Sequence, residues 1–132
     1  MRMGDVQELR LVLTVSEFEA AVALYRDALG LAELEDWSED DAKIVVLDAG
    51  RATLELVNEE QAQRIDRSEV GNRVSGPVRI AFKVADSEAT AKRLAHAGAE
   101  TVADAVTTPW NDRNVRMLGP EGMQLTLFTA LG

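Results

Sequence analysis

Few side chains in this sequence could act as nucleophiles or as strong metal ligands. Its 132 residues include no cysteine and one histidine, His96. Thiol nucleophiles, disulfides and cysteine zinc sites are therefore excluded, and a Ser-His-Asp mechanism has little support. Asp and Glu number 23, whereas Lys and Arg number 14. Carboxylates and guanidinium groups are thus the main candidates for chemistry at a site.

The charge balance narrows the class of partner. The net charge is −9, and this excess of acidic groups opposes binding to a phosphate backbone, so no nucleic-acid partner is expected. No uncharged stretch is long enough to cross a bilayer, and no membrane partner is expected either. The lack of cysteine agrees with a cytoplasmic location. The expected partner is a small molecule.

The elements that would position such groups form an internal repeat. Residues 10–17 and 79–86 align without a gap at an offset of 69, and residues 47–56 and 118–127 align at an offset of 71. Each half opens with strict alternation of apolar and mixed side chains, which predicts a half-buried strand. The chain therefore contains the same structural unit twice.

A helix is predicted after each opening strand, because an apolar stripe at helical spacing follows it in both halves. Ser16 and Glu19 match a capping box at the start of the first helix, and Asp86 is the candidate cap of the second. Gly30 and Gly98 follow the two stripes, where a left-handed residue commonly ends a helix.

Each half then ends in a predicted hairpin, with one turn at residues 48–51 and the other at residues 119–122. A shorter strand is predicted around residues 31–37. The predicted fold class is therefore α+β, built from two tandem β-α-β-β-β modules.

The chain length is that of one domain, spanning residues 1–132. The modules are placed at residues 6–57 and 76–130. Residues 58–75 lack periodicity and are rich in charge, so they are expected to form the connection between the modules.

Three segments carry a family resemblance. They are VSEFEAAVALYRDALGL at 15–31, RIAFKVAD at 79–86 and TPWNDRNVRMLGPEGMQLTLF at 108–128. Together they resemble the vicinal oxygen chelate superfamily, which includes glyoxalase I, ring-cleaving dioxygenases and bleomycin resistance proteins. The resemblance implies the glyoxalase/bleomycin-resistance fold, in which the modules form a curled mixed sheet around a ligand cleft. It also implies a homodimer.

The resemblance further implies where a metal would be held. In metalloenzymes of this superfamily, a His or Gln on the first strand of each module and a Glu on the last strand bind one divalent cation. The matching positions here are Arg10, Glu55, Arg79 and Thr126. Arginine stays protonated near neutral pH and has no lone pair to give to a metal. No metal and no cofactor are therefore expected, and only Glu55 has the chemistry of a ligand.

The alternation predicts which strand side chains face the cleft. They are Arg10, Val12, Thr14, Thr53, Glu55, Val57, Arg79, Ala81, Lys83, Gln124, Thr126 and Phe128. Two roles remain open for the arginines. The favoured role is a structural ion pair of Arg10 or Arg79 with Glu55. The other is donation of hydrogen bonds to an anionic group of a ligand, and both roles can hold together.

Two tryptophans lie in segments that the resemblance brings near the cleft. Trp37 lies within Glu33–Asp41, a run with six carboxylates in nine residues. A solvated face is the favoured interpretation of this run, and an acidic, aromatic wall for flat cations is the alternative. Trp110 lies near the ligand if it follows the resistance-type members, or packs on the edge of the last hairpin.

The predicted ligand-binding residues are Arg10, Trp37, Glu55, Arg79, Trp110, Thr126 and Phe128, with no catalytic and no metal-binding residue among them. This set favours a metal-independent binding protein for an antibiotic or metabolite. The alternative is a divergent glyoxalase- or dioxygenase-like enzyme, a lyase or isomerase, with Glu55 as metal ligand or general base. A structural or regulatory partner protein is a third class.

Overall fold

The structure is a computed structural model that describes residues 6–132, so residues 1–5 of the predicted domain lie outside the described residues. Its elements in chain order are β1 (Val6–Thr14), α1 (Phe18–Val22), η1 (Ala23–Ala28), β2 (Glu33–Asp36), β3 (Ile44–Asp48), β4 (Thr53–Val57), α2 (Glu59–Glu69), β5 (Val78–Val84), α3 (Ser87–His96), β6 (Glu100–Thr107), β7 (Asp112–Leu118), η2 (Pro120–Gly122) and β8 (Gln124–Ala130). The strands form one sheet in the order β2-β3-β4-β1-β5-β8-β7-β6.

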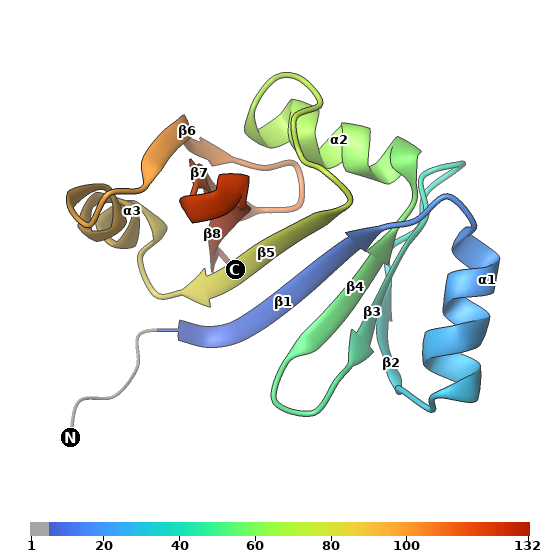
Figure 1. Cartoon of the computed structure of the whole chain (residues 1–132). Coiled ribbons are helices and arrows are strands. Elements are labelled where there is room, and N and C mark those ends of the chain that lie inside the picture. The colour runs from blue at the N-terminus through green and yellow to red at the C-terminus, as the bar shows by residue number, and fades with distance from the viewer. Residues whose placement is uncertain (1–5) are drawn as a thin grey trace.

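The sheet consists of two halves with the same internal pairing. The first and last strands of each half run parallel, as β1 beside β4 and β5 beside β8, while the other neighbours run antiparallel. The halves meet where β1 pairs antiparallel with β5 within the one chain. Figure 1 shows the sheet curling away from this junction on both sides, with α1 and α3 on the outside. The predicted α+β fold of two β-α-β-β-β modules is confirmed.

The two outer helices differ in regularity. At α1 the expected capping box of Ser16 and Glu19 is wrong, because the N-cap is Glu17, one residue later than expected, and its side chain makes no capping hydrogen bond. The chain then continues as a π-helical segment, η1, before Gly30 adopts a φ of 89°. At α3 the predicted cap is confirmed, since the Asp86 carboxylate accepts a hydrogen bond from the backbone N–H of Ala89.

Residues 58–75, which are expected to form only a connection, contain a helix, α2. Asn58 caps it by accepting a hydrogen bond from the backbone N–H of Gln61 at 2.9 Å. Ala62 and Ile65 of α2 then pack on buried side chains of the first half of the sheet, which are Val12, Ile44 and Val57. In Figure 1, α2 lies across the top of the junction between the two halves.

The apolar cores lie mainly on the convex side of the sheet. One cluster joins β3 and β4 to Val22 of α1, and another joins β7 and β8 to Ala91 of α3. The concave side is left for polar and aromatic residues. None of the helices within residues 6–132 is both long and apolar enough to span a membrane.

Candidate functional site

The concave side of the sheet holds a pocket of about 910 Å³. Strands from both halves form its floor, α2 closes one side, and the segments around Trp37 and Trp110 form its rim. The structure brings all seven predicted ligand-binding residues to its wall, namely Arg10, Trp37, Glu55, Arg79, Trp110, Thr126 and Phe128. A volume of this size is typical of a small-molecule site.

One part of the floor, which we call the Glu55 group, consists of Arg10, Glu55, Arg79 and Thr126. Arg10 donates a hydrogen bond to Glu55 at 3.3 Å, and the Arg79 guanidinium lies 3.8 Å from the other carboxylate oxygen. Arg79 also donates to the Thr126 hydroxyl at 2.8 Å. Both arginines therefore pair with one carboxylate, which is the contact expected for their structural role.

Arg10 extends from the Glu55 group toward the aromatic rim. Its guanidinium lies 5.2 Å from the centre of the Phe128 ring and 6.0 Å from that of Trp37. It also donates to the Glu8 carboxylate at 2.9 Å. A guanidinium over an aromatic face is stabilised electrostatically and by stacking. These contacts fix Arg10 between the charged floor and the aromatic wall.

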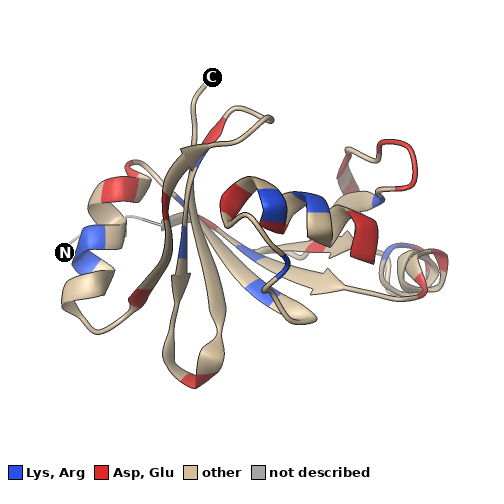
Figure 2. Cartoon of the chain, turned by 90° about the horizontal axis from the view of Figure 1, so that it is seen from above, with Lys and Arg blue, Asp and Glu red and all other residues tan. Residues whose placement is uncertain are grey.

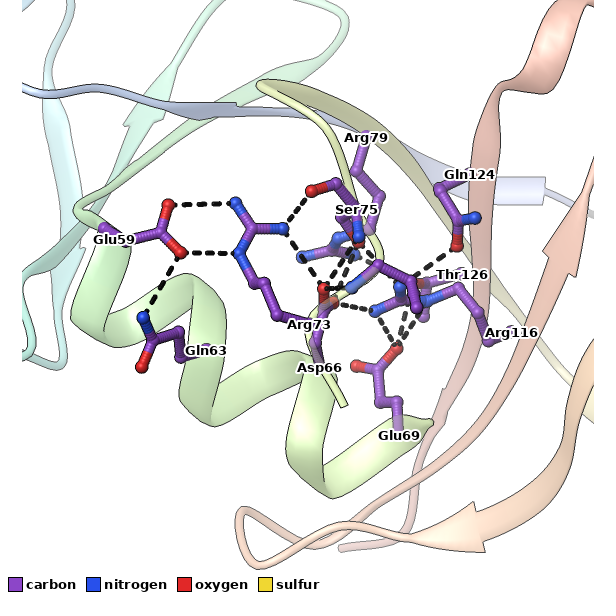
Figure 3. A network of polar contacts seen from close by, with 11 residues as sticks. Glu59, Gln63, Asp66, Glu69, Arg73, Ser75, Arg79, Arg116, Gln124 and Thr126 are labelled. Atoms are coloured by element: carbon purple, nitrogen blue, oxygen red, sulfur yellow. Dashed lines mark hydrogen bonds and ion pairs between the residues drawn. The ribbon is translucent and has the colours of Figure 1, made fainter. Parts of the chain in front are cut away.

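A second charged group, which we call the Arg116 group, lies where α2 meets the second half of the sheet (Figure 3). Arg116 bonds the Glu69 carboxylate at 2.9 Å and lies 3.0 Å from an Asp66 oxygen. Thr126 donates its hydroxyl to Glu69 at 3.0 Å, which connects this group to the Glu55 group. The Arg116 side chain is fully buried. α2 thus provides two carboxylate partners for a buried guanidinium on β7.

Burial and neighbouring charges set the pKa values in both groups. Burial raises the pKa of Glu55 above its usual value, and the guanidinium groups of Arg79 and Arg10 offset only part of this effect. Burial also opposes ionisation of Asp66, but the backbone N–H groups of Ser75 and Val74, together with Arg116 and the Ser75 hydroxyl, outweigh it and lower the pKa of Asp66 to about 2. Asp66 is therefore an anion at neutral pH, whereas burial disfavours the ionised form of Glu55.

The four positions matched to the family's metal ligands lie together on the floor, but their chemistry does not fit a divalent cation. Two of them are guanidinium groups, and Thr126 offers a hydroxyl that is already engaged with Glu69 and Arg79. Among residues 6–132, no three His, Cys, Asp or Glu side chains cluster in a way that would hold a metal ion. The donor set therefore suits an ion pair rather than metal binding.

The rim residues differ from the floor in exposure. Trp37 is 51% exposed and Trp110 is 40% exposed, although both line the pocket. The acidic run around Trp37 is largely solvated, and Glu39 is the carboxylate of that run which reaches the pocket lining, where Arg64 pairs with it at 3.3 Å. His96 is exposed on α3, as expected.

Four of the twelve residues predicted to face the cleft do not line the pocket, partly because α2 covers one end of the concave face. These four are Thr14, Thr53, Val57 and Gln124. Val57 is buried against Ala62 and Ile65 of α2, so this end of the concave face becomes core. Thr53 and Gln124 instead contact the charged side chains Arg10 and Arg116. The remaining eight predicted residues line the pocket.

Sequence reasoning missed Glu69 and Asn114, which also line the pocket. Glu69 depends on α2, and the signals for that helix are Asn58 at the cap, acidic residues in the first turn and Gly71 after its end. Asn114 follows from the period of two in β7, because Asn114 and Arg116 are two residues apart and share a face.

Comparisons with known proteins agree with this fold. The methylmalonyl-CoA epimerase of Mycobacterium tuberculosis is 21% identical, with a TM-score of 0.67 over 100% of this chain and 93% of that chain. A Streptomyces coelicolor methylmalonyl-CoA epimerase variant in complex with 2-nitronate-propionyl-CoA is 20% identical, with a TM-score of 0.64 over 96% of both chains.

A glyoxalase/bleomycin resistance protein/dioxygenase superfamily member from Vibrio splendidus 12B01 is 13% identical, with a TM-score of 0.62 over 92% of this chain and 97% of that chain. No functionally curated protein matches the sequence. The family model for this superfamily matches residues 9–127. The chain therefore belongs to the Glyoxalase/Bleomycin resistance protein/Dioxygenase superfamily.

Proposed function

We propose that this chain is a metal-independent binding protein for a planar small molecule of the antibiotic or metabolite type. The observation that carries the proposal is a pocket with Trp37, Trp110 and Phe128 in its wall, above a floor whose charges pair with one another. Aromatic side chains bind flat rings through stacking, and paired floor charges need no counter-ion from the ligand. A protein that acts by binding its ligand needs affinity for it but no catalytic residue.

Binding is measured by NMR titration with a panel of planar compounds. The chain contains two tryptophans, and both line the pocket, so their two indole N–H signals report on this site. Saturable shifts of both signals, without turnover of the compound, are the expected result. Trp110→Ala weakens binding, whereas Leu29→Ala, which changes a side chain 65% exposed and outside the pocket lining, leaves it unchanged. A panel that shifts neither signal contradicts the proposal.

Metal independence is tested by incubating the protein with Ni²⁺, Zn²⁺, Mn²⁺ or Fe²⁺, desalting it and measuring metal content. We expect no stoichiometric retention, because two of the four matched positions carry guanidinium groups. Retention near one metal per chain that is lost in Glu55→Ala but kept in Glu88→Ala, an exposed carboxylate on α3, would overturn this part of the proposal.

A second candidate function is a metal-free lyase or isomerase with Glu55 as general base. It is favoured by the raised pKa of Glu55 and by the two guanidinium groups beside it, which would stabilise an enolate. Turnover of a carbonyl compound that is abolished in Glu55→Gln, while binding and fold are retained, would establish the enzyme and displace the binding protein.

We also propose a homodimer, which follows from the family resemblance. Light scattering on the purified protein is expected to give twice the mass of the chain. A mass equal to that of one chain across the micromolar range would contradict this proposal.

A further inference from the structure

One buried polar atom in the pocket wall lacks a hydrogen-bond partner. Asn114 on β7 is 3% exposed and lines the pocket. Its amide nitrogen donates to the Glu69 carboxylate at 2.9 Å. Because a carboxylate only accepts, this bond fixes the orientation of the amide and directs its oxygen away from Glu69. Among residues 6–132, Asn114 Oδ1 is the buried side-chain nitrogen or oxygen without a hydrogen bond.

The neighbouring donors are already engaged elsewhere. Arg116 donates to Glu69, Ser75 and Gln124, and the Thr126 hydroxyl donates to Glu69. Buried acceptors in native proteins are almost always satisfied, since a missing partner costs desolvation energy without return. The acceptor of Asn114 is therefore unsatisfied among the described residues, in a residue that lines the pocket, and a donor on a bound ligand would satisfy it.

The strand register defines what surrounds this acceptor. Asn114 is paired with Phe128 on β8, and Phe128 is paired with Lys83 on β5. Directly paired residues on adjacent strands have neighbouring Cβ atoms on the same face, so the Asn114 and Phe128 side chains start side by side in the pocket wall. Asp112, two residues before Asn114, shares its face of β7 and also lines the pocket. The aromatic side chain of Phe128 and the unpartnered amide oxygen of Asn114 thus belong to neighbouring residues of one pocket wall.

We propose that Asn114 Oδ1 is the polar anchor of the ligand site, and that it selects planar compounds carrying an N–H or O–H donor at the edge of the ring. The donor bonds Asn114 Oδ1 while the ring lies against Phe128. This inference rests on the proposed binding function and adds the hydrogen-bond polarity of the ligand to it.

The test uses matched pairs of compounds that differ only in the donor. Suitable pairs are naphthalene-2-carboxamide with its N,N-dimethyl derivative, 2-naphthol with 2-methoxynaphthalene, and indole with N-methylindole. Affinities are measured by NMR titration of the two tryptophan indole signals in the full chain. In the native protein, the donor compound of at least one pair is expected to bind about tenfold more tightly, or more.

The Asn114→Leu variant, which removes the acceptor and keeps a similar volume, is expected to bring this ratio to about one. Asn114→Ala, which also removes the acceptor, serves in the same way if the leucine variant fails to fold. A structural role of Asn114 alone would change the affinities of both members of a pair equally and leave their ratio unaltered.

The outcomes separate the two proposals. If both members of every pair bind the native protein equally, the anchor is refuted while the binding function stands. The same conclusion follows if the preference persists in both Asn114 variants. If no member of any pair shifts the tryptophan signals, the binding function and the anchor fail together.

Discussion

The two charged groups on the concave side of the sheet combine guanidinium and carboxylate groups in opposite proportions. In the Glu55 group, two guanidinium groups surround one carboxylate, and Arg10 is 17% exposed at its side chain. In the Arg116 group, two carboxylates surround one guanidinium, and the Arg116 side chain is 0% exposed. The first group faces the pocket, whereas the second lies beneath α2. Figure 2 shows that α2 itself carries residues of both charges.

This difference indicates a division of roles. A buried cation between two carboxylates is desolvated, so its removal leaves uncompensated charges in the interior. In the Glu55 group only Arg10 keeps appreciable solvation, whereas Arg79 and Glu55 are 8% and 5% exposed at their side chains, so loss of the Arg10 contact costs less. The Arg116 group therefore holds α2 on the sheet, and the Glu55 group remains open to a ligand. The following variants test this division, beginning with the largest expected effect.

Arg116→Met is expected to lower the free energy of unfolding by about 3–5 kcal/mol, because Asp66 and Glu69 lose their shared partner. Urea unfolding followed by circular dichroism measures the change. Arg113→Met is the matched control on the same strand, since Arg113 pairs with Glu88 at the surface. A loss below about 1 kcal/mol for Arg116→Met would show that the group does not hold α2.

Asp66→Asn is expected to cost about 2 kcal/mol at neutral pH. The pKa of Asp66 is lowered to about 2 from an ordinary value of 3.8, so its ionised form stabilises the native state. That stability is present above pH 4 and is lost as the pH falls toward 2. Stability measured across this window should fall more steeply in the native protein than in the variant. If the stabilities of the native protein and the variant depended on pH in the same way, ionised Asp66 would not stabilise the native state.

Glu55→Gln is expected to change stability at neutral pH by less than about 1 kcal/mol. Burial raises the pKa of Glu55 above its ordinary value of 4.5, so the neutral form is favoured by folding and the amide resembles that form. Stability of the native protein should therefore decline relative to the variant as the pH rises above 4.5. A cost as large as that of Arg116→Met would remove the distinction between the two groups.

The smallest change is expected at the surface pair of Arg113 and Glu88, whose side chains are 35% and 55% exposed. Arg113→Met should alter stability by about 0.5 kcal/mol or less, and added salt should reduce even that. An effect above about 1 kcal/mol would mean that exposure does not explain the contrast between the charged groups.

The repeat made much of this fold predictable. The alternation around Arg10 and Arg79 placed both side chains on the concave face, since a period of two is a direct geometric signal. α2 was missed because its apolar side is narrow, with Ala62 and Ile65 as its buried apolar residues. The contribution of Glu69 to the pocket could not be predicted without that helix.

The junction of β1 with β5 also could not be decided from the pattern. Two modules can pair within one chain or between two chains with identical alternation, and only the three-dimensional path of residues 58–75 selects the first arrangement. The unpartnered oxygen of Asn114 is likewise a property of geometry, because the asparagine type alone does not indicate which of its atoms is satisfied.

The antiparallel junction of β1 and β5 relates the two modules by an approximate twofold axis. A cavity with that symmetry would offer every guest two equivalent orientations. Within residues 6–132, α2 is not repeated after the second module, and it closes one side alone. The helix therefore makes the two ends of the cavity inequivalent, so the two opposite orientations of an asymmetric guest would meet different side chains.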